Sequence, residues 1–153
     1  MYPTVPVATF GWLFVVLFLF WSLPARPAAF LGMIVGWMVL PVYDYEFPGI
    51  PDYGKVFAVG FPVLLGTIVF HFDLIRQLRF CWHDLFAIGF CIAPFFSAID
   101  NGLGAYNGVS ETNEFLVVWM FPYLIGRIYL TSIEAIRDLM GMLFVSGVAY
   151  APL

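Results

Sequence analysis

Charged residues are scarce in this chain, and their scarcity excludes most soluble folds. Of the 153 residues, 10% are charged and 63% are hydrophobic, whereas a soluble domain has about 25% charged and about 45–50% apolar residues. Six lysine or arginine residues stand against ten acidic ones, which excludes the basic surface that nucleic-acid binding requires. A chain of this size cannot cover so much apolar surface, so we expect the lipid bilayer to surround most of it.

Cysteine is nearly absent, and so are the sequence patterns of metal and catalytic sites. Cys81 and Cys91 are separated by about 15 Å along the axis if they share a helix, which is too far for a disulfide. The sequence contains no metal-ligand spacing such as Cys-x-x-Cys, no phosphate-binding loop and no nucleophile motif. We therefore predict no metal site and no cofactor, and we assign no catalytic residue.

The sequence contains instead six apolar runs joined by short connections. Each run approaches the length of about 17–25 residues that a membrane-spanning helix needs. No lysine or arginine precedes Arg26, so we interpret the first run as a retained span rather than a signal peptide. The predicted fold is all-α, a single polytopic transmembrane domain over residues 1–153. Its predicted spans are residues 7–23, 28–43, 55–72, 82–99, 114–130 and 139–153.

Two of the later connections carry specific turn signals. We predict a loop over residues 100–113, with turns at Asn101-Gly102 and Asn107-Gly108, because asparagine and glycine adopt turn conformations readily. In the next connection, Glu134 follows Thr131 by three residues, which is the capping-box spacing. This pattern predicts a short interfacial turn of helix before the sixth span.

The basic residues alternate with the predicted spans. Five of the six lie in or next to the connections after the first, third and fifth spans, and only Lys55 does not. Because basic residues collect on the cytoplasmic side of membrane proteins, we predict a multi-pass protein of the bacterial cytoplasmic (inner) membrane with both termini on the periplasmic side. The residues predicted to face the cytoplasm are Arg26, Arg76, Arg79, Arg127 and Arg137.

Small residues four positions apart predict where helices pack closely. Gly32 and Gly36 lie on one face of the second span, and Gly89 and Ala93 lie on one face of the fourth. Such pairs let another helix approach closely in a membrane, and we predict helix packing at both. The alternative is chance spacing in a glycine-rich membrane helix.

Three polar residues near the cytoplasmic side have two interpretations each. Arg127, near the end of the fifth span, either binds an anion such as a lipid headgroup phosphate or extends to the headgroup layer, which we favour. His71 and His83 could ligate a haem or another pigment. Neither has a partner one helical turn away, which favours interfacial hydrogen bonding. We predict bound lipids, and we find no support for a pigment.

Four stretches together resemble one family of membrane enzymes. They are residues 40–55 (LPVYDYEFPGIPDYGK), 97–108 (SAIDNGLGAYNG), 119–129 (WMFPYLIGRIY) and 147–153 (GVAYAPL). In order and spacing they resemble the N-terminal half of bacterial O-antigen ligase/polymerase-like membrane proteins. The resemblance implies action on glycans carried by undecaprenyl pyrophosphate, with functional residues in the C-terminal half of the family. No catalytic residue therefore carries over to this chain.

Two functions remain open from the sequence. The first is a non-catalytic accessory or structural subunit that binds other transmembrane subunits in a larger membrane complex. The second is the N-terminal part of an O-antigen ligase/polymerase-like glycosyltransferase, whose partner is an isoprenoid-linked glycan. We favour the first, because six helices without a cluster of ionisable residues offer nothing that stabilises a glycosyl-transfer transition state.

Overall fold

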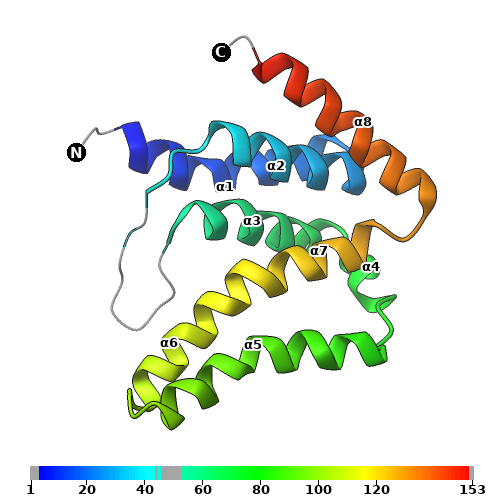
Figure 1. Cartoon of the computed structure of the whole chain (residues 1–153). Helices are drawn as coiled ribbons and strands as arrows, with labels where there is room; N and C mark the ends of the chain where they lie inside the picture. Colours follow the sequence, from blue (N-terminus) through cyan, green and yellow to red (C-terminus); the bar gives the residue numbers. More distant parts are fainter. Residues whose placement is uncertain (1–3, 44, 46–52, 152–153) are drawn as a thin grey trace.

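The computed structural model describes residues 4–43, 45 and 53–151, which are almost entirely helical (Figure 1). The described residues contain one isolated antiparallel bridge, between Tyr45 and Tyr53, and no strand. The prediction of an all-α fold is confirmed. The elements are α1 (Thr4–Ser22), α2 (Ala25–Val39), α3 (Lys55–Phe70), α4 (Phe72–Arg76), α5 (Trp82–Asp100), α6 (Ala105–Phe115), the π-helical turn η1 (Leu116–Met120), α7 (Phe121–Tyr129) and α8 (Ile133–Tyr150).

Among the described helices, two are long and apolar enough to cross a membrane. They are α1, over Val5–Ser22, and α5, over Trp82–Asp100. α2 and α3 are also apolar but have 15 and 16 residues. α2 ends where Leu40 becomes extended, since the following Pro41 disfavours helix at the residue before it. Membrane association thus has support in two helices, while the six spans stay a prediction.

The predicted loop over residues 100–113 is wrong beyond its first five residues. The chain turns at Asn101–Gly104, where Gly102 and Gly104 have φ angles of 72° and 86°. Glycine enters this left-handed region without steric cost. Helix α6 then begins at Ala105, so Asn107-Gly108 lies inside a helix and forms no turn.

The sixth apolar run also begins earlier than predicted. Helix α8 starts at Ile133, and the Ser132 hydroxyl accepts a hydrogen bond of 3.2 Å from the Ala135 N–H. Ser132 rather than Thr131 therefore caps the helix. The segment predicted as a separate interfacial turn is the first part of α8.

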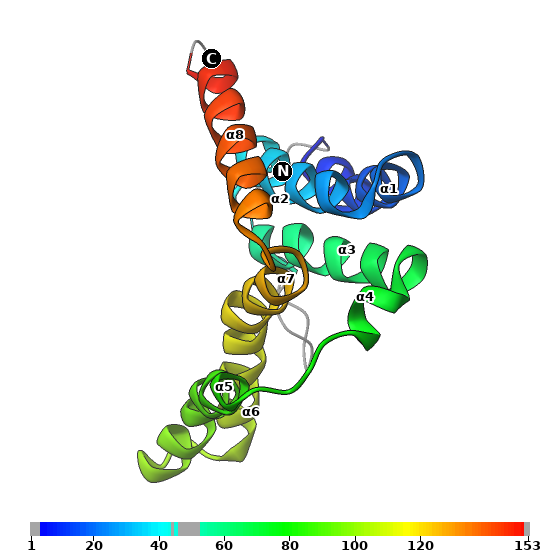
Figure 2. The same cartoon turned by 90° about the vertical axis from the view of Figure 1, so that its right-hand side faces the viewer.

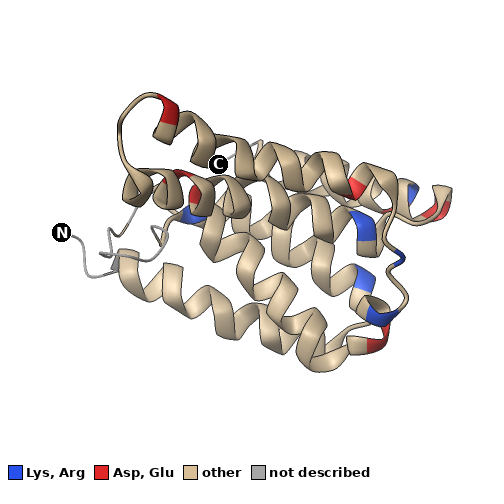
Figure 3. Ribbon diagram, turned by 90° about the horizontal axis from the view of Figure 1, so that it is seen from below, with Lys and Arg blue, Asp and Glu red and all other residues tan. Residues whose placement is uncertain are grey.

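Successive long helices alternate in direction. α1, α3 and the continuous helix α6–η1–α7 run one way, and α2, α5 and α8 run the other way (Figure 1). Figure 3 shows the charged residues at the two ends of these helices, with most of the lysine and arginine residues at one end. The connections that follow α1, α3 and α7 meet at this end. We call it the arginine-rich end.

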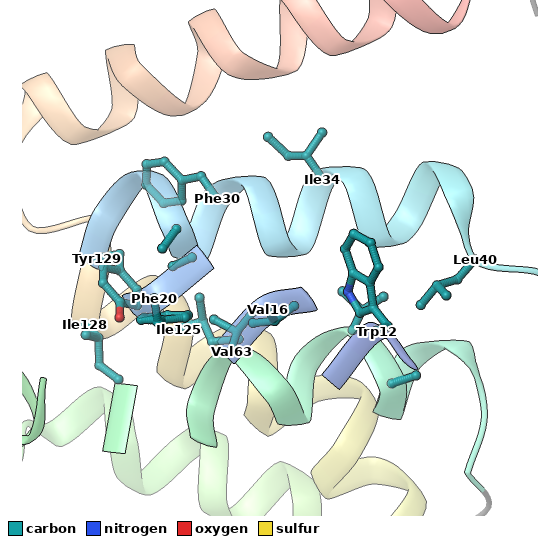
Figure 4. Close-up of a cluster of buried hydrophobic side chains, with 14 residues drawn as sticks. Trp12, Val16, Phe20, Phe30, Ile34, Leu40, Val63, Ile125, Ile128 and Tyr129 are labelled. Atoms are coloured by element: carbon teal, nitrogen blue, oxygen red, sulfur yellow. The ribbon is translucent and has the colours of Figure 1, made fainter. Parts of the chain in front are cut away.

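The hydrophobic core lies where α1, α2 and α3 meet α7 (Figure 4). Its polar groups are few, and the hydroxyls of Thr67 and Tyr129 share a hydrogen bond of 2.7 Å across the α3–α7 contact. Side chains from all four helices fill the space around this pair. They include Trp12, Val16, Phe20, Phe30, Ile34, Val59, Val63, Ile125 and Ile128.

Two glycines of α2 allow this close packing. A Cβ atom on Gly36 would lie 2.8 Å from Nε1 of Trp12 on α1 and 2.9 Å from Cγ2 of Val59 on α3. On Gly32 it would lie 3.3 Å from valine methyl groups of both helices. Gly32 and Gly36 therefore provide a close helix approach, and the helices they contact belong to the same chain.

Gly89 and Ala93 on α5 are placed differently. A Cβ atom on Gly89 would meet nothing within 4 Å in the described part of the chain, and both residues are exposed. No described side chain or backbone packs closely at Gly89, whereas Ala93 lines a pocket together with Glu111 and Phe115 of α6. Packing there against another subunit stays a prediction.

α8 and the α5–α6 hairpin extend away from the core on opposite sides (Figure 2). α8 contacts α2, and α5 contacts α6 and η1. Their outer faces expose large apolar side chains, such as Phe144 on α8 (74% exposed) and Phe86 on α5 (65% exposed). Extended apolar surface of this kind contacts lipid or another apolar surface.

The contact at Gly36 predicts opposite effects for two glycine substitutions. Gly36→Ala should destabilise the protein, because overpacking costs about 1–3 kcal/mol. That cost exceeds the gain of about 1 kcal/mol from alanine's higher helix propensity. Gly89→Ala should leave the melting temperature unchanged or raise it, since the site is open. Thermal unfolding in mild detergent, followed by circular dichroism, measures both; equal melting temperatures would contradict the close approach.

Candidate functional site

A polar cluster lies at the arginine-rich end, where the start of α5 meets α7. Asp84 is the third residue of α5, and its carboxylate accepts a hydrogen bond of 2.6 Å from the backbone N–H of Cys81. This bond satisfies a backbone donor at the start of the helix. Tyr123 and Arg127 lie four positions apart on α7, so their side chains share one helix face. Both reach the Asp84 carboxylate.

Both carboxylate oxygens of Asp84 are occupied. The Tyr123 hydroxyl donates to Oδ1 at 2.5 Å, and Nη2 of Arg127 donates to Oδ2 at 3.1 Å. The same Nη2 donates to the backbone carbonyl of Arg79 at 2.8 Å. We refer to Asp84, Tyr123 and Arg127 as the Asp84 cluster. The side chains of Asp84 and Arg127 are 14% and 31% exposed, so solvent screens their attraction only in part.

The Asp84 cluster lines a cavity of about 260 Å³ between α5 and α7. Much of the remaining lining is apolar and includes Ile88, Met120 and Leu124. A charge in such surroundings is costly unless it is paired, and the Asp84 carboxylate neutralises the Arg127 guanidinium. The arrangement therefore joins two helices through a charge-assisted contact.

The π-helical turn η1 determines which face of α7 carries these donors. η1 ends at Met120 and directly precedes α7, whose second residue is Pro122. Proline has no N–H, and its ring crowds the carbonyl four residues before it in an α-helix. The wider π-helical turn accommodates this interruption and rotates the helix that follows. Tyr123 and Arg127 consequently lie on the face next to Asp84.

Sequence reasoning identified Arg127 but missed its partners. An arginine within an apolar run needs a counter-ion. This requirement already indicated that an acidic residue lies next to Arg127. Nη1 and Nε of Arg127 make no hydrogen bond to the described residues. Anion binding by Arg127 therefore stays a prediction. The same side chain also forms an ion pair with Asp84.

The two histidines lie apart in the chain at this end, His71 between α3 and α4 and His83 on α5. His71 ends α3, packs near the Phe20 ring at 6.1 Å between ring centroids, and its buried Nε2 has no hydrogen-bond partner among the described residues. His83 is exposed in the first turn of α5. The described residues contain no group of three or more His, Cys, Asp or Glu that could hold a metal ion. No described contact supports haem or pigment ligation at His71 or His83.

Comparisons of the chain with models of protein families, with curated proteins and with solved structures found no match. The resemblance to O-antigen ligase/polymerase-like proteins therefore stays a prediction from the four stretches that carry it.

The ion pair between Asp84 and Arg127 predicts non-additive effects of substitution. Asp84→Asn and Arg127→Gln should each lower the melting temperature in detergent, because each leaves the other charge unpaired in apolar surroundings. The double variant should lose less than the sum of the two single losses. Asp73→Asn, which removes an exposed acid at the same end, is the control and should change nothing. Additive losses would show that the two side chains do not interact.

Proposed function

We propose that this chain is a non-catalytic, multi-pass protein of the bacterial cytoplasmic membrane that acts as an accessory or structural subunit of a larger complex. The observation that carries the proposal is the uncovered apolar surface of α5. Only 11% of the residues of its candidate span are buried. In a membrane, such a helix contacts lipid or the helices of another subunit.

The distribution of charge supports six spans and their orientation. The long helices alternate in direction, and the arginine-bearing connections meet at one end (Figures 1 and 3). If that end faces the cytoplasm, as the positive-inside rule requires, both termini lie on the periplasmic side. The shorter helices α2 and α3 would cross with flanking residues extending to the headgroups.

The Asp84 cluster supports a structural rather than a catalytic role. Its carboxylate accepts three hydrogen bonds, from donors on α7 and at the start of α5. A general base must be free to accept a proton from substrate, and Asp84 is committed to joining helices. The cluster therefore explains how α5 is held against the core without requiring a reaction.

The small-residue face of α5 is the contact that we assign to a partner helix. Gly89 is open to approach, and the exposed Phe86 and Phe90 lie beside it on the same helix. Close approach at small residues favours association of membrane helices through van der Waals contact. A transmembrane helix of another subunit would cover this apolar surface.

One observation favours the alternative of a glycosyltransferase fragment. The stretch 119–129 contains the end of η1 and all of α7, and it supplies Tyr123 and Arg127. The stretch that resembles the enzyme family therefore coincides with the end of the π-helical turn and with the helix that carries two residues of the Asp84 cluster. Under this alternative the isoprenoid-linked glycan is bound together with residues outside this chain.

Native mass spectrometry of the protein extracted from its own membranes tests the proposal. We expect the 17.3 kDa chain at fixed stoichiometry with other transmembrane subunits. Gly89→Leu should reduce the amount of co-purified partner, because it blocks close approach at an open site, and it should leave the melting temperature of the isolated chain unchanged. A chain that is found only alone would contradict the proposal. A longer polypeptide that retains an isoprenoid-linked glycan would favour the alternative.

A further inference from the structure

A groove lined entirely by apolar residues lies between α2, α7 and α8. Phe30 and Ile34 point from α2 toward α8 at its floor (Figure 4). Its volume is about 340 Å³, within the range of small-molecule binding sites. Its lining extends along α2 from Phe30 to Met38, a distance of about 12 Å at the rise of an α-helix.

The groove opens to the outer surface of the molecule. Three of its lining residues are partly exposed: Trp37 on α2 (48%), Leu130 directly after α7 (37%) and Leu143 on α8 (42%). A ligand can therefore enter from the side, where the proposed function places the bilayer. A single hydrocarbon chain fits the shape and the chemistry of the groove.

A basic side chain, Arg26, lies close in the chain to one end of the groove lining. Arg26 lies one turn before Phe30, and Asp138 directly precedes the lining residue Leu139. Nη1 of Arg26 contacts Oδ2 of Asp138 at 3.5 Å, and this pair is exposed. A guanidinium has five N–H donors, and Nη1 is the only nitrogen of Arg26 hydrogen-bonded to the described residues. Arg26 can therefore bind a phosphate while it keeps its contact with Asp138.

We propose that this groove is a binding site for one diacyl phospholipid, with an acyl chain between α2, α7 and α8 and the phosphate at Arg26. The acyl chain covers apolar side chains that α8 leaves uncovered. The phosphate lies at the arginine-rich end, where the headgroup layer of the cytoplasmic leaflet is expected. The inference rests on the membrane location in the proposed function, and it is independent of any partner subunit.

Gly126 provides a substitution that fills the groove without disturbing the core. It lines the groove, and a Cβ atom there would meet only Cδ1 of Leu130, at 3.9 Å. Gly126→Leu therefore places a side chain where the acyl chain would lie. Gly141→Leu on α8 is the matched control, because Gly141 lies outside the groove lining and a Cβ atom there meets nothing within 4 Å.

The test measures phospholipid retained by the full chain after detergent delipidation and addition of dioleoyl-phosphatidylglycerol, by native mass spectrometry. We expect one retained phospholipid for the wild type and for Gly141→Leu, and at least a tenfold lower retained fraction for Gly126→Leu. Arg26→Gln should also lower retention, whereas Asp138→Asn, which breaks the same ion pair but keeps the guanidinium, should not. Circular dichroism melting confirms that each variant is folded.

The results that would contradict the phospholipid site differ from those that would contradict the proposed function. Equal retention by Gly126→Leu and Gly141→Leu would overturn the groove as the site. Equal losses in Arg26→Gln and Asp138→Asn would show that the ion pair matters for structure and that no phosphate is bound there. A chain that co-purifies with a partner but retains no phospholipid would overturn this inference alone.

Discussion

The structure depends on one constraint: a chain with so few polar side chains must satisfy its backbone hydrogen-bonding groups within its own helices. An unpaired backbone group in an apolar solvent costs several kcal/mol. Helices therefore occupy nearly all of the described residues, and the tightest turns fall at proline and glycine, as at Pro24 and at Gly102 and Gly104. In the described part of the chain, the charged residues lie toward the two ends of the helices (Figure 3). Proline also lies inside the long helices α3 and α5, at Pro62 and Pro94, and Pro122 follows the π-helical turn η1.

Close packing rather than polar contact holds the core together. Lipid removes the hydrophobic drive between helices, so association in a membrane relies on contact area and a few hydrogen bonds. Gly32 and Gly36 supply the contact area by bringing α1 and α3 onto α2. Several of the polar contacts between helices involve α7: Tyr129 hydrogen-bonds to Thr67 of α3, while Tyr123 and Arg127 hydrogen-bond to Asp84 of α5. α7 thus joins the core to the α5–α6 hairpin. The positions of its polar residues along the helix determine where that hairpin packs.

Hydropathy was sufficient to predict the all-α fold and the approximate position of each apolar run, because apolar runs of this length are helical. The glycine spacing also indicated the close contact at Gly32 and Gly36. The helix over residues 105–115 could not be predicted, since its asparagine, glycine and serine residues individually favour turns. Packing overrides that preference: a Cβ atom on Gly108 would lie 3.1 Å from the Phe95 carbonyl oxygen, so α6 lies tightly against α5. The sequence also could not identify Asp84 as the partner of Arg127, because several acidic residues lie near the arginine-rich end.

The central claim is that the helices cross the bilayer in alternation, with the arginine-rich end in the cytoplasm. Labelling of single cysteines by a membrane-impermeant maleimide tests it most directly, in a background where Cys81 and Cys91 are replaced by alanine. Leu103→Cys and Thr131→Cys each place a thiol at an exposed position, in the connections after α5 and α7 respectively. The account predicts labelling of Leu103→Cys in intact cells and of Thr131→Cys only after the membrane is permeabilised. Labelling of both from the same side would contradict the alternation, and the reverse pattern would contradict the orientation.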